Sequence, residues 1–209
     1  MQSENHITTV TSTTETLAVF ILVLVAGSLI SLISVHLLDR GVNPIRDAVS
    51  DYGAREYAWF YRLTAIWMGV AGVLMAVMLG DAMFPKPTWT IILLLIFAAT
   101  RTAITIFPTD LEDEEETSVG RSHVVLAAIA FAAIALAATT FNLAMVGDPF
   151  WNDSETLLNV LGVFLVGAAV ATGAARKVVA AGYFGLVERI FYVAMFAWFS
   201  AVALVLLTG

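Results

Sequence analysis

Charged and polar side chains that can bind an anion or move a proton are few in this chain, and most of them interrupt or border long apolar runs. Arg101 is the most unusual of them, because it follows the run LLLIFAAT and precedes TAITIF. A charge at this depth in a membrane span costs about 3 kcal/mol and by default marks a functional site. The alternative is that Arg101 extends to lipid phosphates at the interface. We expect its guanidinium to point into the bundle and to meet a carboxylate or a polar group of the segment Asn43–Tyr52.

Two histidines, His36 and His123, lie near the same interface as Arg101. The chain has no H-x-x-x-H or H-E-x-x-H spacing, so the pattern favours interfacial hydrogen bonding and predicts no metal and no cofactor. An enzyme interpretation stays open, in which His123 acts as acid or base with Asp51 or Asp110 in lipid hydrolysis or transfer. The Ser50–Asp51 pair fits a hydrolase in residue type, but no G-x-S-x-G motif supports it.

Several arginines close to one interface suit a phosphate, because a guanidinium can bind two phosphate oxygens at once. The predicted ligand is therefore an anionic lipid headgroup or a lipid phosphate that the protein binds, senses or moves. The alternative to both binding and catalysis is a structural subunit, a partner of another membrane protein or a homo-oligomer, whose arginines only set topology. The predicted ligand-binding residues are Arg46, Asp47, Ser50, Arg62, Arg101, Arg121, His123 and Arg189.

The elements that must position these residues are membrane spans. Of 209 residues 60% are hydrophobic and only 13% are charged, about half the charged share of a soluble domain. Backbone groups in lipid must be bonded within the segment, so the fold class is all-α, a polytopic bundle of six transmembrane helices. The six apolar stretches are Leu17–Val35, Trp59–Leu79, Thr88–Phe107, Val124–Val146, Leu157–Ala175 and Ile190–Leu207.

The rest of the composition bounds the domain organisation and the partners. Residues 1–16 are polar and lack Lys and Arg, so they predict an extracellular tail before a retained first span rather than a signal peptide. Residues 17–209 form a single transmembrane domain. The net charge of −7 argues against nucleic acid as a partner. The acidic run Asp110–Glu116 is typical of a solvated loop.

Basic residues are distributed unequally between the two sides of the predicted bundle, which predicts its orientation. The side with both termini has one, Lys86. The opposite side, which includes the span ends, has nine: Arg40, Arg46, Arg55, Arg62, Arg101, Arg121, Arg176, Lys177 and Arg189. We therefore expect a plasma-membrane protein with both termini outside and the first, third and fifth loops in the cytoplasm.

The loop between the first two spans is longer than a connector needs to be. Its NPIRD sequence resembles a helix start, with Asn43 as the N-cap and Pro44 at the first position. We expect a short amphipathic helix at the inner interface, with Ile45, Val49 and Tyr52 facing lipid or the bundle. The alanine-rich fourth span predicts a helix at the bundle centre, because small residues allow close packing in lipid; a general compositional bias toward alanine explains it equally well.

Four motifs along the chain resemble those of a known family. NPIRDAVSDYGA, a following span that contains Trp, FPTD, and GRSH at the start of the next span are similar to the prokaryotic membrane family catalogued as domain of unknown function 998. The resemblance covers nearly the whole chain and implies a six-span protein, but no reaction or ligand. The residues that match the family pattern are Pro44, Arg46, Asp47, Ser50, Phe107, Pro108, Asp110 and His123.

Overall fold

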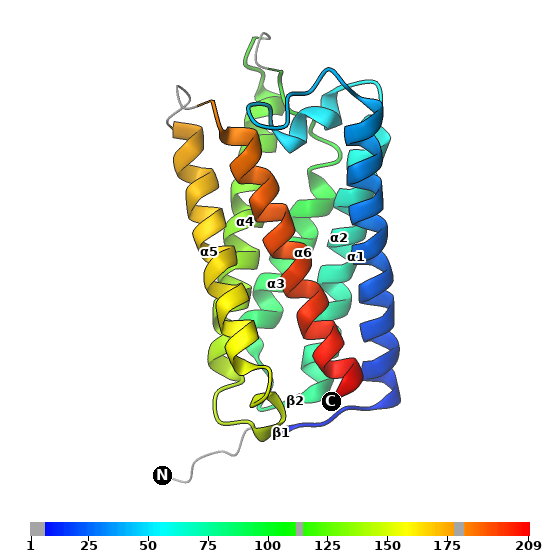
Figure 1. Cartoon of the computed structure of the whole chain (residues 1–209), viewed down its shortest axis with the longest axis vertical. Helices are drawn as coiled ribbons and strands as arrows, with labels where there is room; N and C mark the ends of the chain where they lie inside the picture. The colour runs from blue at the N-terminus through cyan, green and yellow to red at the C-terminus, as the bar shows by residue number, and fades with distance from the viewer. Residues whose placement is uncertain (1–6, 112–114, 178–181) are drawn as a thin grey trace.

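The computed structural model describes residues 7–111, 115–177 and 182–209. Within them, six long helices pack side by side (Figure 1), which confirms the prediction of an all-α membrane bundle. Residues 112–114 of the acidic run and the first six residues of the predicted tail lie outside the described residues. The helices are α1 (Ser12–Leu38), α2 (Ala58–Ala82), α3 (Thr88–Ala103), α4 (Ser118–Ala144), α5 (Glu155–Lys177) and α6 (Phe184–Thr208). Two short 3₁₀ helices lie in the loops, η1 (Val49–Ala54) and η2 (Pro149–Trp151).

Five of these helices are long and apolar enough to cross a membrane, and α3 is a shorter apolar helix. The sequence predicted that the third span would continue to Phe107, but α3 ends at Ala103. Tighter turns follow, in which the amides of Thr105 and Ile106 donate to the carbonyls of Thr102 and Ala103. Pro108 lacks an amide proton and disfavours helix in the residue before it, so the chain leaves the helix before that point.

At one end of the bundle, residues before the first helix are ordered against two distant loops (Figure 1). Strand β1 (Ile7–Thr8) pairs antiparallel with β2 (Met83–Phe84). The Thr8 hydroxyl donates to Asp148 and accepts from the Trp151 indole N–H. Helix α1 then begins at Ser12 rather than at Leu17, with Thr11 as its N-cap. Part of the predicted polar tail therefore closes the terminal end of the bundle.

Helices α2 and α6, and not the alanine-rich α4, are the most buried. In the most apolar window of each helix, 56% of the α2 residues and 61% of the α6 residues are buried, against 39% for α4 and 28% for α5. The aromatic side chains of α6 fill the centre, among them the fully buried Trp198 and Phe199. The prediction that α4 lies at the centre is therefore wrong; its small side chains leave space instead of filling it.

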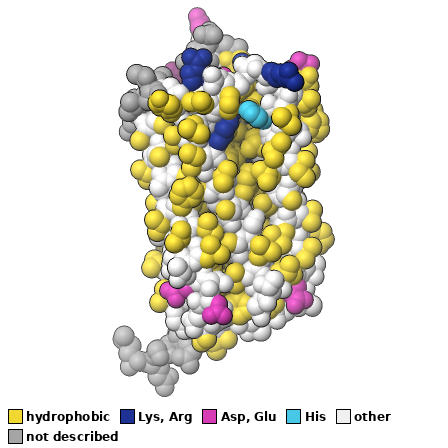
Figure 2. Space-filling view, in the orientation of Figure 1, with side chains coloured by type: hydrophobic (Ala, Val, Ile, Leu, Met, Phe, Trp, Pro, Cys, Tyr) yellow, Lys and Arg dark blue, Asp and Glu magenta, His cyan; other side chains and the backbone are white. Residues whose placement is uncertain are grey.

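Lysine and arginine side chains gather at the end of the molecule opposite the two termini (Figure 2). Between the two ends, hydrophobic side chains cover the visible face, as expected of a surface that contacts lipid. The loops at the basic end contain most of the residues singled out from the sequence, so the candidate site is built there.

Candidate functional site

The segment Asn43–Tyr52 is only partly helical: Asn43–Asp47 forms a compact turn, and a short 3₁₀ helix begins at Val49. The Asn43 side chain caps a single turn, in which its Oδ1 accepts from the amides of Ile45 and Arg46. The Asp47 carboxylate accepts from the Asn43 amide at 2.6 Å and closes the turn. The chain then continues as η1, in which Val49 is buried. The predicted cap at Asn43 is present, but the helix that it starts ends after one turn.

This segment binds the first turn of α6, which has amide groups without partners inside the helix. The amides of Gly185 and Leu186 donate to the carbonyls of Arg46 and Ile45. A Cβ atom at position 185 would overlap the carbonyl oxygen of Asp47, so the close approach requires glycine. The loop therefore supplies the cap that α6 lacks.

Two charged side chains of α6 complete this contact. The Arg189 guanidinium donates to the carbonyl of Asp47 at 2.9 Å and lies over the Tyr52 ring. The Glu188 carboxylate is buried, and its Oε2 accepts from the Val49 amide at 2.6 Å. Arg189, which the sequence assigned to a ligand, is thus engaged with the loop.

Around η1, two further groups have shifted acid–base properties. Burial raises the pKa of Asp51 to about 6, although its carboxylate accepts from the Ala48 amide. Burial also raises the pKa of Tyr52, whose hydroxyl is 2.8 Å from the His36 ring Nδ1. His36 therefore contacts the loop.

A second set of contacts fixes the start of α4. The Asp110 carboxylate accepts from the amide and the hydroxyl of Thr117, and these bonds lower its pKa. A Cβ atom on Gly120 would overlap this carboxylate. The His123 Nδ1 lies 2.7 Å from the carbonyl oxygen of Phe107. Because a carbonyl only accepts, Nδ1 carries the proton, and the Nε2 of a neutral ring is an acceptor.

Arg101 points into the bundle, as predicted, and is only 1% exposed. Its partner is the Tyr192 hydroxyl of α6, at 3.1 Å, and its guanidinium also lies over the Tyr192 ring. The predicted partner, a carboxylate or a polar group of the segment Asn43–Tyr52, is therefore wrong, because the bond is to a tyrosine of α6. No described residue accepts a hydrogen bond from its Nε or Nη2.

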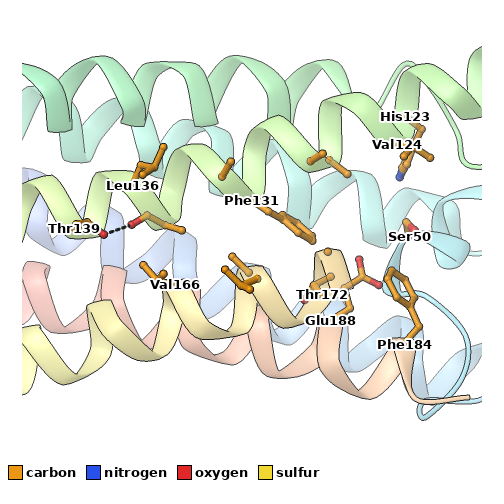
Figure 3. A pocket seen from close by; sticks show the side chains of 17 residues that line it. Ser50, His123, Val124, Phe131, Leu136, Thr139, Val166, Thr172, Phe184 and Glu188 are labelled. Carbon is orange, nitrogen blue, oxygen red and sulfur yellow. Dashed lines mark hydrogen bonds between the residues drawn. The ribbon is translucent and has the colours of Figure 1, made fainter. Parts of the chain in front are cut away.

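A cavity of about 610 Å³ lies between α4, α5 and α6. Its walls are mainly apolar and come from Val124 to Thr139 on α4 and Val166 to Gly173 on α5. Figure 3 shows Ser50, His123, Phe184 and Glu188 together at one end, and Leu136 and Thr139 at the other. The cavity is therefore amphipathic, with its polar groups at the basic end of the bundle.

The structure brings only two of the predicted site residues to this cavity, Ser50 and His123. Arg62 lines a separate surface cleft of about 490 Å³ together with Arg55 and Asp110. The other predicted residues line neither: Arg46 and Arg121 are exposed, Arg101 is in the core, and Asp47 and Arg189 hold the loop. The predicted arginines are thus dispersed over four places: a surface cleft, the exposed surface, the core and the contact between the first loop and α6.

Glu188 and the cavity itself were not predicted as a site. The sequence did contain a signal for Glu188, because an acidic residue in the first turns of an apolar helix is costly. The sequence of α4 did indicate one continuous helix face, because small and apolar residues recur at helical spacing, including Val124, Ala128, Ala135 and Thr139. That pattern does not distinguish a packed helix face from a hollow one.

Comparison with known proteins identifies a family for this chain. The family model described as "Protein of unknown function (DUF998)" matches residues 16–205. No curated protein and no solved structure matches the chain. The residues that suggested the family lie mostly in the two loop contacts described above, at the starts of α4 and α6. The chain therefore belongs to the DUF998 family.

Proposed function

We propose that the protein binds a membrane lipid, with an acyl or prenyl chain along α4 and a polar head beside Ser50, His123 and Glu188. The observation that carries this proposal is the amphipathic cavity between α4, α5 and α6. Its volume, about 610 Å³, is within the range of about 300–1,000 Å³ that is usual for small-molecule sites. Binding, sensing and transfer of a lipid all require such a site.

The length of the cavity supports a chain rather than a compact ligand. His123 and Thr139 line its two ends and are sixteen residues apart on α4, which corresponds to about 24 Å at the helical rise of about 1.5 Å. A single leaflet contributes about 15 Å of a hydrocarbon core of about 30 Å. A chain that enters at the interface can therefore extend past the middle of the membrane.

The outer surface of α4 and α5 supports entry from the bilayer. Two residues that line the cavity, Leu136 and Val170, are also 52% and 67% exposed. They belong to facing helices, so the cavity opens between α4 and α5 toward the side where lipid chains lie. A lipid can then enter sideways, with its head staying near the interface.

Filling the cavity tests the proposal. The Gly173→Phe variant places a ring among the lining residues, whereas Gly167→Phe places one on the same helix outside the cavity; both glycines have open space around the position of a Cβ. We expect Gly173→Phe to lose lipid that co-purifies with the wild type, as measured by native mass spectrometry, and Gly167→Phe to retain it. Equal lipid retention in all three proteins, with equal thermal stability, would overturn the proposal.

A lipid hydrolase or transferase is the second candidate function. It is favoured by one observation, that Ser50, His123 and Glu188 line the same cavity. The His123 Nδ1 proton points to a backbone carbonyl and not to an acid, and Asp110 is bonded to Thr117. If this function holds, purified protein releases fatty acid from a fluorogenic ester lipid and Ser50→Ala abolishes the release; no release by the wild type would exclude it for ester lipids.

We further propose that the basic end of the bundle faces the cytoplasm of a plasma-membrane protein. The support is the gathering of Lys and Arg opposite the termini. Since the chain has no cysteine, single cysteines report orientation cleanly. An impermeant thiol reagent added to intact cells should label Thr9→Cys and leave Ser118→Cys unlabelled. The reverse pattern would contradict the orientation.

A further inference from the structure

We infer that the head of the bound lipid is uncharged and donates a hydrogen bond, as the free hydroxyl of a lipid alcohol does. This inference rests on the proposed lipid site and specifies its ligand class. It differs from the anionic headgroup that the arginine count predicted, because the polar end of the cavity has an acidic side chain and no Lys or Arg.

The charge that lines the cavity is negative. Glu188 is the only charged residue among the described residues that line it, and no Lys or Arg is among them. A phosphate beside this carboxylate would meet a like charge where little water screens it, and such repulsion is strong in a low-dielectric site. The cavity therefore selects against an anionic head.

Two arginines that do not line the cavity already attract Glu188, which disfavours a cationic head as well. The Arg189 guanidinium attracts the Glu188 carboxylate, and the Arg101 guanidinium adds a weaker attraction from within the core. Arg101 is bonded to Tyr192, one helical turn beyond Glu188 on α6, and it does not line the cavity. Because the arginines that attract Glu188 do not line the cavity, a neutral ligand leaves their interaction undisturbed and adds no charge without a partner.

Glu188 and Thr172 present acceptors at this end of the cavity, and the Ser50 hydroxyl can donate or accept. Glu188 Oε2 accepts from Val49, and no described residue donates to its Oε1. Thr172 uses its proton on the carbonyl of Ala168, which leaves its oxygen as an acceptor. A lipid hydroxyl is the matching donor.

Three lipids with the same chains separate the alternatives. Dioleoylglycerol has a free hydroxyl, its 3-acetyl ester is neutral without a donor, and dioleoyl phosphatidic acid carries a phosphate. We expect wild-type protein in nanodiscs to retain dioleoylglycerol about tenfold better than the other two, the factor expected for one hydrogen bond to a buried acceptor. The Gly173→Phe variant should retain none of them.

The Glu188→Gln variant gives a matched test of the residue. An amide oxygen can still accept from the Val49 amide, while the amide nitrogen presents donors to the cavity. We therefore expect the preference for the alcohol to disappear, because the amide N–H groups can donate to the hydroxyl oxygen and to the ester oxygens alike, and we expect thermal unfolding to show that the fold persists. An unchanged preference for the alcohol in Glu188→Gln would overturn the role of Glu188 and with it the inference.

The outcomes for the inference and for the lipid site itself are distinguishable. If the wild type retains phosphatidic acid as well as or better than dioleoylglycerol, the head inference fails while the lipid site stands. If the wild type retains none of the three lipids, like the Gly173→Phe variant, the proposed lipid site itself is overturned.

Discussion

The α2–α3 and α4–α5 pairs are both antiparallel neighbours in the bundle, but they pack in different ways. In the first pair, Gly69 and Gly72 of α2 lie against α3: a Cβ at position 69 would be 2.5 Å from the Thr102 hydroxyl, and one at 72 would be 3.0 Å from Phe97. In the second pair, Gly162 of α5 likewise lies against Asn142 of α4, but Gly173, which lines the cavity, has nothing within 4 Å of that position. Small residues thus bring the first pair together and leave part of the second pair apart.

The difference shows that small residues in a membrane helix have two uses. Where facing side chains fit the groove, glycine allows close contact, and dispersion forces stabilise the pair. Where nothing fills it, the same composition produces a cavity that a lipid can occupy.

Replacing one glycine by alanine in each helix pair should distinguish close packing from an open groove. This comparison should give the largest effect. We expect Gly69→Ala to lower stability by about 1–3 kcal/mol, because the new carbon overlaps Thr102 and the backbone oxygen of Ala98. The matched Gly173→Ala variant should not lose stability. Thermal unfolding in detergent measures both, and an equal loss in the two variants would contradict the comparison.

Breaking the contact at the start of α4 should have a smaller effect. Asp110→Ala removes the acceptor for the amide and the hydroxyl of Thr117, so the helix that forms one cavity wall loses its end contact. We expect a lower unfolding temperature, whereas Glu115→Ala removes an exposed carboxyl of the same loop and should change little. Because bonding lowers the Asp110 pKa, its contribution should be present above pH 3.8 and decrease as the pH falls further.

A charge change in η1, next to the cavity residue Ser50, should be visible as a pH dependence of stability. The pKa of Asp51 is raised from 3.8 to about 6, so its protonated form favours the fold. Stability should be greatest below 3.8 and decrease as the pH rises toward about 6. The Asp51→Asn variant should not show this decrease. The measurement is the unfolding temperature of the wild type minus that of the variant, followed as a function of pH. A constant difference would mean that Asp51 does not titrate in this range.

The bundle was predictable because each apolar run carries its own evidence of a helix in lipid. The ends of the helices were less predictable. Thr11 caps α1 earlier than the hydrophobicity indicated, and Pro108 shortens α3. In each case a local backbone effect moved the boundary that hydrophobicity alone suggested.

The candidate site was predictable only in part, because it depends on which helix faces which. Burial cost correctly indicated that Arg101 points inward, since lipid gives a buried charge no alternative partner. Its contact with Tyr192 depends on the position of α6, which no local pattern specifies. His123 and Ser50 were selected by type, but only the fold places Glu188 beside them.

The contact between the first loop and α6 joins residues that are far apart in the chain, as in the bond between Val49 and Glu188, 139 positions away. During synthesis, the loop after α1 emerges long before the last helix exists. The turn is closed by its own Asn43 and Asp47 bonds, but its capping carbonyls and the Val49 amide gain their partners only when α6 packs beside α1. In a chain that ended before residue 184, these groups of the first loop would therefore lack the partners that α6 supplies.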